Sequence, residues 1–421
     1  MRAQLVPSLP RRAWIVLGGD MLTAVGTGMT MPFFVVYLNR VRGIDLRVAG
    51  LALAVAAAAS FGGNVLGGSL ADRFGPRRGL MVGLVLGAGG ASWFAFVGSA
   101  TEAFAAAALI GLGASIVWPA EDALLAGAVD DSQRSNVFSL RHATMNAGFG
   151  VGAVIAAAIV DIGSPTSFQV LYLVDAATFL AFVPLLASLR GIGERMPPFE
   201  EDNGGYRTVL ADRTFLAVWA LTALLVTVGY AQYAAAFPPY AIGTGGVSAH
   251  ALAAAFAANT FAVAVLQLFV LRALAGHRRT TALALASVVF GLAWCVTIFA
   301  AQLGGGGAGA VGFACAMAIL AVAETLLSPA LSPIVNDLAP ERLRGRYNGT
   351  FILAWTTGFT IGPAVAGAGL GLGDGTPYFV LLAAACAAAA ACSLGLRRRL
   401  PPHIDLVPAH HESSTLQPEA V

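Results

Sequence analysis

Long runs of apolar residues, separated by short polar stretches, follow one another along almost the whole chain. A membrane-spanning helix needs about 20 apolar residues. Twelve runs approach this length, at about 13–38, 47–70, 79–98, 103–127, 138–161, 169–189, 214–238, 249–272, 281–302, 310–330, 347–369 and 377–396. Strands of a membrane β-barrel would alternate in polarity over about 10 residues, and these runs do not alternate. The pattern therefore predicts an all-α membrane protein with twelve transmembrane helices.

The composition supports this interpretation. Of the 421 residues, 57% are hydrophobic and only 11% are charged, whereas a soluble domain has about 25% charged residues. A single soluble core stops growing near about 250–300 residues, so the surplus apolar surface must face lipid. The four cysteines, Cys295, Cys315, Cys386 and Cys392, fall inside predicted helices without metal-ligand spacing. We expect no metal site and no cofactor.

The basic residues are distributed unevenly between the two sides of the membrane. All 24 of them are arginines. If the N-terminus lies inside, the even-numbered connections and the two tails hold 21 arginines, and the outer loops hold only Arg40, Arg42 and Arg47. Because cytoplasmic loops are enriched in basic residues, we predict that both termini are cytoplasmic. The lysine-free, alanine- and glycine-rich composition favours the cell membrane of a bacterium.

The chain contains an internal duplication. The stretch "PAEDALLAGAVDDSQRSNVFSL" joins the end of the fourth run to the fifth and aligns without gaps with "PALSPIVNDLAPERLRGRYNGT", which joins the tenth to the eleventh, 210 residues further on. The alignment predicts two six-helix halves in the same orientation. A Pro-, Gly- and acid-rich segment lies between them, and a polar tail follows them. We divide the chain into an N-terminal half, a cytoplasmic linker, a C-terminal half and a disordered cytoplasmic tail, at 1–189, 190–213, 214–396 and 397–421.

The stretch "GGSLADRFGPRR" (67–78), between the second and third runs, resembles the signature G-x-L-A-D-R-x-G-R-R of the major facilitator superfamily. It departs from the signature at Pro76. A fainter copy, "VLRALAGHRRT" (270–280), follows the eighth run and repeats the glycine and the two closing arginines, but lacks the acid. The resemblance implies two halves that rock against each other around a substrate site near the midplane of the membrane.

The resemblance also implies a conformational latch on the cytoplasmic side. Asp72 is expected to cap the start of the eleventh span near Tyr347, because a helix N-terminus favours a negative charge. The acid that the family carries at the end of the fourth span is replaced by Gly127, and Asp337 keeps it in the second copy. The residues assigned to the latch are Gly68, Asp72, Arg73, Gly75, Arg77, Arg78, Arg134 and Arg344. The alternative is that the arginines serve only to fix the topology.

Three acids, Asp20, Asp175 and Glu324, lie inside predicted spans. An ionised carboxylate near a helix centre costs about 2.5–3.5 kcal/mol on insertion, and we expect no membrane-embedded basic residue to pair with these acids. They therefore either face a watery cavity or hold a proton, and both options suit proton coupling. A structural, hydrogen-bonded acid is the alternative for each. We interpret Glu121 and Asp122, near the end of the fourth span, as solvated.

Polar and aromatic side chains within the spans predict a substrate cavity. Asp20, Thr23, Thr27 and Thr30 share one face of the first span. The residues assigned to the cavity are Thr23, Thr27, Asn146, Tyr230, Tyr233, Asn259, Gln267, Trp355 and Phe359. Acids, amides and aromatic walls suit lipophilic or cationic compounds through stacking and cation–π contacts. Helix packing is the alternative for each aromatic residue.

The stretches "GTGMTMPFFVVYL" and "NAGFGVGAVIAAAI" resemble the twelve-helix drug:proton antiporter branch, although the fifth-span motif is reduced to Gly148 and Gly152. The resemblance implies a secondary active transporter for proton-coupled efflux of small lipophilic or cationic compounds. Proton-coupled uptake of a small metabolite is the alternative, and a non-transporting sensor is a weaker one. The glycines of "GAGLGLGDG" follow no strand, so we expect no enzyme. The expected partners are substrate, protons and the lipid bilayer, without nucleic acid, and a monomer is expected to suffice.

Overall fold

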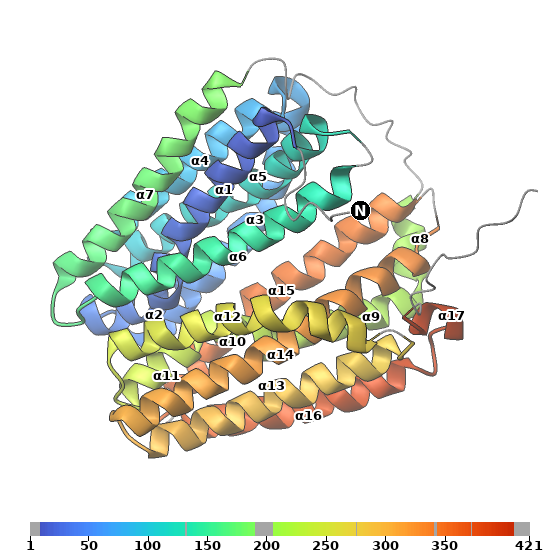
Figure 1. The fold of residues 1–421 in the computed structure, drawn as a ribbon. Coiled ribbons are helices and arrows are strands. Elements are labelled where there is room, and N and C mark those ends of the chain that lie inside the picture. Colours follow the sequence, from blue (N-terminus) through green and yellow to red (C-terminus); the bar gives the residue numbers. More distant parts are fainter. Residues whose placement is uncertain are drawn as a thin grey trace, which may run out of the picture.

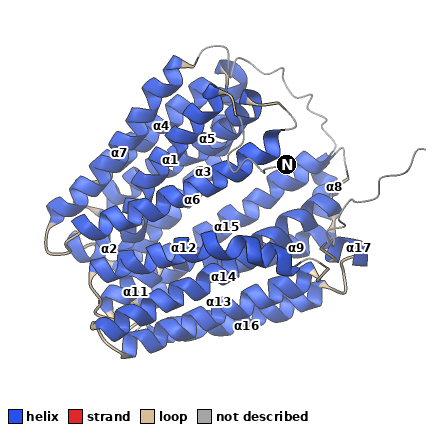
Figure 2. Ribbon diagram, viewed as in Figure 1, coloured by secondary structure: helices blue, strands red, loops and turns tan. Residues whose placement is uncertain are grey.

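The computed structural model describes residues 9–130, 133–189, 205–274, 276–340, 343–371 and 373–407. Within its helices, the side chains at some positions, including 64–73, 134–136 and 344–345, lie outside this description. Helices make up nearly all of the regular structure in the described residues (Figure 2), and the only β pairing there is one isolated bridge. The all-α prediction is confirmed.

The N-terminal bundle is formed by long helices that coincide with the first six apolar runs. They are α1 (Arg11–Thr30), α3 (Leu46–Phe74), α4 (Pro76–Phe94), α5 (Ala100–Ala128), α6 (Arg134–Ile159) and α7 (Pro165–Ser188). After α1 the chain continues through the short helical segments η1 (Met31–Phe33), α2 (Phe34–Val36) and η2 (Tyr37–Val41). The break follows from Pro32, which lacks the backbone N–H that an uninterrupted α-helix would use.

The C-terminal bundle repeats this arrangement over the last six runs. Its helices are α9 (Arg213–Leu225), η4 (Val226–Tyr230), α10 (Ala231–Ala235), α11 (Phe237–Gly243), α12 (Ala249–Leu274), α13 (Arg279–Gln302), α14 (Gly307–Leu338), α15 (Arg344–Leu370) and α16 (Thr376–Leu396). Two short helices lie outside the predicted spans, α8 (Gly205–Ala211) before the bundle and α17 (Pro402–Asp405) after it. Figure 1 shows the two bundles side by side.

Eleven helices or helical stretches are long and apolar enough to cross a membrane. They match eleven of the twelve predicted runs. The remaining run forms the 19-residue helix α4, whose first turn contains Arg77 and Arg78. This helix packs against α5 and α7 inside the N-terminal bundle. The prediction of a helix at every apolar run is therefore confirmed.

One glycine in each bundle, at matching positions of the sequence repeat, brings two helices close together. A Cβ at Gly148 of α6 would lie 2.7 Å from the Ala24 side chain of α1, and one at Gly358 of α15 would lie 2.5 Å from the Val226 side chain. The glycines are 210 residues apart and their partners 202 residues apart. Because a side chain there would collide with the facing helix, both crossings depend on glycine. The two bundles thus share this close crossing at positions that match in the sequence repeat.

We call the end of the molecule that carries Arg77, Arg278 and Arg279 the basic end, and the opposite end, with the turns at 42–45 and 244–248, the far end. The bundles approach each other closely near the far end, where a Cβ at Gly50 of α3 would lie 2.5 Å from the Pro363 carbonyl oxygen of α15. Contacts of α2 with α10 and α11 lie at the same end. In Figure 1 the ribbons of the two bundles diverge toward the end where α8 and α17 lie.

Two expectations about the polar segments change in the described residues. We expected the chain after Leu396 to be disordered, but residues 397–407 are described and include α17 and the fully buried Asp405. The tail is ordered there because Leu400 and Ile404 are buried against the C-terminal bundle. The predicted linker contains the helix α8, and its residues 190–204 lie outside the description. Residues 408–421 do as well.

Candidate functional site

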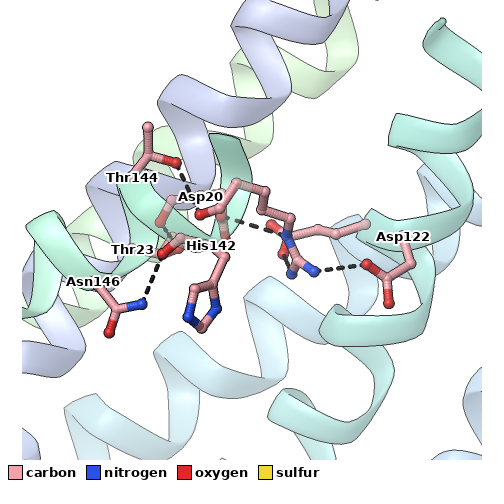
Figure 3. A network of polar contacts seen from close by, with 8 residues as sticks. Asp20, Thr23, Asp122, His142, Thr144 and Asn146 are labelled. Atoms are coloured by element: carbon pink, nitrogen blue, oxygen red, sulfur yellow. Dashed lines mark hydrogen bonds and ion pairs between the residues drawn. The ribbon is translucent and has the colours of Figure 1, made fainter. Parts of the chain in front are cut away.

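The most concentrated group of charges inside the bundle surrounds Arg141 of α6. Its guanidinium group donates to the Glu121 carboxylate at 2.7 Å and to the Asp122 carboxylate at 2.6 Å, and its Nε lies 3.5 Å from the Asp20 carboxylate. Asp20 belongs to α1, and the other two acids belong to α5. Figure 3 shows Asp20 and Asp122 on different helices. We call these four residues the Arg141 cluster.

Most of this cluster is buried. Arg141 is 7% exposed, Asp20 5% and Glu121 1%, whereas the side chain of Asp122 is 50% exposed. One carboxylate oxygen each of Asp20 and Glu121 has no hydrogen-bond partner among the described residues, and the two carboxyl groups are close enough to interact directly. The cluster therefore has an exposed side at Asp122 and a buried side at Asp20 and Glu121.

Two expectations from the sequence are wrong at this point. We expected no basic partner for Asp20 within the membrane, but Arg141 is that partner. The apolar run 138–161 contains Arg141, which we counted among the basic residues of the preceding loop. Glu121 is also not solvated, because it is buried and its carboxylate pairs with Arg141 of α6. A basic residue inside an apolar run was the signal that would have identified the cluster.

The position of α5 gives the cluster an aromatic neighbour. The ring of Trp118 lies 5.3 Å from the guanidinium carbon of Arg141, within cation–π distance. Trp118 and Asp122 are four residues apart, so they share a face of α5. Trp118 as a whole and the side chain of Asp122 are each 50% exposed. This face forms the accessible edge of the Arg141 cluster.

The polar stripe predicted on α1 meets two different helices. The Thr23 hydroxyl donates to the Asp20 carbonyl oxygen, on the side of the Arg141 cluster. Thr30, further along α1, donates to the Asp175 carboxylate of α7 at 2.9 Å. Thr27 is partly buried between them. The stripe is therefore divided between a charged cluster and a separate buried pair.

Asp175 forms that second buried group. It is 5% exposed, and its other carboxylate oxygen has no hydrogen-bond partner among the described residues. The Tyr172 hydroxyl, one helical turn away, is likewise buried without a described partner. Because the Thr30 hydroxyl is its only described side-chain partner, Asp175 is not a member of the Arg141 cluster.

The third predicted acid, Glu324 of α14, lies in the C-terminal bundle. Asn259 of α12 donates to the Glu324 carboxylate at 3.3 Å and to the Met317 carbonyl oxygen at 3.1 Å. Tyr230 and Tyr233 lie close enough to Glu324 to interact with it electrostatically. Glu324 therefore lies close to three of the residues assigned to the cavity, and the role of these residues stays a prediction.

Aromatic rings extend from this acid along α15. The Tyr230 ring centroid lies 5.4 Å from that of Trp355, which lies 6.3 Å from that of Phe359. The ring centroid of Tyr233 lies 4.5 Å from that of Phe256. We call Glu324 with Tyr230, Tyr233 and Trp355 the Glu324 group. It has a carboxylate and aromatic faces, and none of its members is basic.

The remaining predicted cavity residues contribute less. The Asn146 side chain donates to the His142 carbonyl oxygen of its own helix α6. Gln267 of α12 is partly buried. The structure therefore does not bring Asn146 or Gln267 into contact with either group of acids among the described side chains.

The predicted latch is only partly within the description. The side chains of Gly68, Asp72, Arg73, Arg134 and Arg344 lie outside the described residues. Gly75 has a φ of 84°, a backbone conformation that favours glycine. Arg77 donates to the Leu189 carbonyl oxygen at the end of α7, within the same bundle, and Arg78 is exposed. The latch function stays a prediction.

A different acid lies next to Tyr347. The Tyr347 hydroxyl donates to the Asp212 carboxylate at 2.9 Å. The other oxygen of that carboxylate accepts the backbone N–H groups of Thr214 and Phe215 and caps α9. Asp212 belongs to the predicted linker, where we assigned no functional residue. The end of the linker thus joins the starts of α9 and α15.

Comparisons with known proteins agree with this architecture. The family model described as Major Facilitator Superfamily matches residues 16–311 and 219–418. The chain is 26% identical to the uncharacterized MFS-type transporter YttB of Bacillus subtilis, over 85% of this chain and 88% of that protein. It is 24% identical to a Na(+), Li(+), K(+)/H(+) antiporter of Planococcus maritimus, over 82% and 87% of the two chains.

Two further comparisons cover a relative and a solved structure. The multidrug resistance protein MdtH of Aeromonas salmonicida is 28% identical over 48% of this chain and 50% of that protein. The crystal structure of the nucleoside transporter NupG (D323A mutant) matches with a TM-score of 0.76 at 12% identity, over 91% of this chain and 99% of that chain. The likeness to this structure concerns the fold.

Proposed function

Because the chain belongs to the major facilitator superfamily, we propose that it exports small lipophilic or cationic compounds in exchange for protons. The proposal has three parts: the Arg141 cluster binds and releases the proton, the Glu324 group contacts the substrate, and the two bundles alternate in access. In the proposed orientation the basic end faces the cytoplasm of a bacterial cell, because arginines accumulate there.

The charge balance of the Arg141 cluster is the observation that supports proton coupling most strongly. One guanidinium group meets three carboxyl groups, two of them buried. If all were ionised, the cluster would carry two uncompensated negative charges in a largely buried setting. Like charges that share such a site do not all ionise, so we infer that a proton is held there. Asp20 and Glu121 are its natural holders, because both are buried and their carboxyl groups are close enough to interact directly.

The geometry suggests how this proton moves. Asp122 is half-exposed, so a proton can pass between solvent and Arg141's other partners at this edge. When Arg141 pairs fully with one buried carboxylate, the other must keep its proton, because an unpaired buried charge costs several kcal/mol. A movement of α5 against α1 would change which acid Arg141 compensates. Alternating access would thereby be linked to proton binding and release.

The Glu324 group supports a cationic or lipophilic substrate. Its carboxylate attracts a positive charge, and the rings of Tyr230 and Trp355 offer the faces that cations prefer. A likeness to the protein named multidrug resistance protein MdtH points in the same direction for half of the chain. The likeness to a protein named as a cation/H(+) antiporter supports exchange with protons.

Transport into inverted membrane vesicles tests the function directly. Vesicles that contain the protein are acidified inside, and uptake of radiolabelled tetraphenylphosphonium, a lipophilic aromatic cation, is measured with and without a protonophore. We expect uptake that depends on the pH gradient and release of protons from the vesicle interior during uptake. A parallel assay with Na⁺ distinguishes organic from inorganic cation exchange.

Other outcomes would change the proposal. Accumulation of a compound in right-side-out vesicles, driven by an inward proton gradient, would instead show uptake by symport. Transport that persists unchanged in the presence of the protonophore would remove the proton from the mechanism.

A further inference from the structure

We propose that Asp405, from the segment that follows the last long helix, is a positioning residue for transport, because it supplies the acid that the loop between α12 and α13 lacks. This proposal rests on the proposed alternating access of the two bundles. It assigns a mechanical role to a part of the chain that we expected to be disordered.

The loop between α12 and α13 is a second copy of the signature loop. Gly276 has a φ of 74° and Gly75 one of 84°, so both loops have a glycine with positive φ at this position. Arg278 and Arg279 follow Gly276 at the same spacing as Arg77 and Arg78 follow Gly75. The position that corresponds to Asp72 is occupied by Ala273. The second loop therefore has two arginines and a helix N-terminus but no acid of its own.

Asp405 fills this electrostatic gap from 125 residues away in the sequence. One of its carboxylate oxygens accepts the backbone N–H of Thr280 at 2.9 Å, at the start of α13. The other accepts the Thr280 hydroxyl at 3.1 Å and an N–H of Arg278 at 3.2 Å. Asp405 is fully buried. A carboxylate at a helix N-terminus is stabilised by the helix dipole as well as by these hydrogen bonds.

The backbone around Asp405 is fixed to the same loop. The Gly276 N–H donates to the Val407 carbonyl oxygen at 3.0 Å, and the Val407 N–H donates to the His277 carbonyl oxygen at 2.9 Å. Leu400 and Ile404 are buried in the apolar core of the C-terminal bundle. We call residues 400–407 the C-terminal strap.

Arg279 extends the connection to a third helix. Its guanidinium group donates to the Ile404 carbonyl oxygen of the strap at 2.8 Å and to the Asp337 carboxylate near the end of α14 at 2.5 Å. Arg279 itself is only 6% exposed. The strap therefore ties the ends of α12, α13, α14 and α16 together at the basic end.

This connection matters for a carrier whose halves rock as bodies. Arg278 pairs with Asp405 and Arg279 with Asp337. These pairs hold the loop to its own bundle, so that the loop and the bundle move together when the basic end closes. If Asp405 lost its charge, the start of α13 would lose its cap and Arg278 its partner. The loop would then move relative to its own bundle when the basic end closes, which would make the closed conformation less stable. The conformations open at that end would therefore be more populated.

The test uses the full-length protein with three variants. Asp405→Asn removes the charge at nearly constant size, and Asp405→Glu keeps it. Asp374→Asn is the matched control, because Asp374 also accepts the N–H and hydroxyl of a threonine at a helix start, but at the far end. Arg278→Gln removes only the partly exposed partner and serves if Asp405→Asn does not fold.

Two readouts need no known substrate. Hydrogen exchange is measured at the amides of Gly276 and Thr280. Spin labels at Ser188 and Gly395, which are exposed at the basic ends of the two bundles, report the distance between the bundles at pH 5.5 and 8 after the four cysteines have been replaced. The third readout is tetraphenylphosphonium transport in inverted vesicles.

We expect at least tenfold faster exchange at Thr280 in Asp405→Asn, a shift of the label distances toward longer values and about a tenfold lower maximal rate, with KM changed less than twofold. Asp405→Glu should recover most of each effect, and Asp374→Asn should show none. Arg278→Gln should show the same shifts at a smaller size.

Unchanged exchange and unchanged label distances in Asp405→Asn and Arg278→Gln would overturn the proposal. So would faster exchange with label distances and maximal rate at the unmodified values, because the strap would then only stabilise the bundle. If the unmodified protein transports no tetraphenylphosphonium, the proposed function is in doubt, and the label distances still decide the role of Asp405.

Discussion

The two bundles share a helix scaffold and differ in the chemistry at matching positions. Arg141 of α6 corresponds to Phe351 of α15, and Glu121 of α5 corresponds to Leu331 of α14, at the repeat distance of 210 residues. Phe351 is 6% exposed and Leu331 is completely buried in an apolar core. The charged cluster of the N-terminal bundle thus has an apolar counterpart in the C-terminal bundle.

The glycine crossings explain why both versions fit one scaffold. Gly148 and Gly358 set the distance between the crossing helices in each bundle, and side chains further along the same helices differ between the bundles. Asp20 corresponds to Thr222 at the 202-residue offset of these two helices, and here too a charged residue matches an uncharged one. Thr222 is fully buried, and its hydroxyl donates to the Val218 carbonyl oxygen of its own helix. Packing is repeated, whereas the buried charge belongs to one bundle.

The largest expected effect comes from removing the cation of the charged bundle. In Arg141→Met, the acids of the cluster lose their counter-charge and should stay protonated, so they cannot release a proton during the cycle. We expect gradient-driven accumulation of tetraphenylphosphonium in inverted vesicles to fall at least 100-fold. Phe351→Met, at the matching position, is the control and should remain within twofold. Equal activity of both variants would show that the charged bundle has no special role.

The comparison can be sharpened by placing a charge in the apolar bundle. Leu331→Glu buries a carboxylate in an apolar core with Phe351, not an arginine, at the position that matches Arg141, and an uncompensated buried charge costs about 3–5 kcal/mol. We expect a marked loss of folded protein, measured as the monodisperse yield and the melting temperature in detergent. The double variant Leu331→Glu with Phe351→Arg should recover part of the loss. A single variant as stable as the unmodified protein would contradict the view of this region as an apolar core.

Asp20→Asn tests the buried side of the charged cluster with a smaller change. Asparagine imitates the protonated acid, so substrate binding and exchange without a gradient should survive. Accumulation driven by the pH gradient should fall about 30-fold, because one holder of the proton is lost while Glu121 remains. Binding is followed by scintillation proximity and accumulation in inverted vesicles. If accumulation is normal, Asp20 is structural, and Glu121 becomes the leading proton site.

The smallest expected effect concerns the other bundle. Glu324→Gln removes the negative charge of the Glu324 group but keeps a partner for Asn259. We expect about tenfold weaker binding of tetraphenylphosphonium, equivalent to about 1.4 kcal/mol, with the pH dependence of accumulation retained. A neutral lipophilic compound of similar size should bind as before. Loss of proton coupling with unchanged affinity would reverse the roles assigned to the two bundles.

The apolar runs by themselves determined the helices, because a segment in lipid must satisfy its own backbone hydrogen bonds and therefore forms a helix. The boundaries followed closely, as in α5, expected at 103–127 and found at Ala100–Ala128. The duplication likewise predicted two equivalent halves, and the structure adds that the crossings at Gly148 and Gly358 recur in both. These features depend on local composition and spacing, which a sequence displays directly.

Only the tertiary structure decided which charges meet. Arg141 was assigned to a loop. Its partner Asp20 belongs to a helix that is far away in the sequence, and its partner Glu121 was interpreted as solvated. Asp405 was placed in a disordered tail, yet it caps α13. The physical reason is the same in both cases. The cost of a buried charge depends on the group it faces, and that group is fixed by packing between helices rather than by the neighbouring residues in the chain.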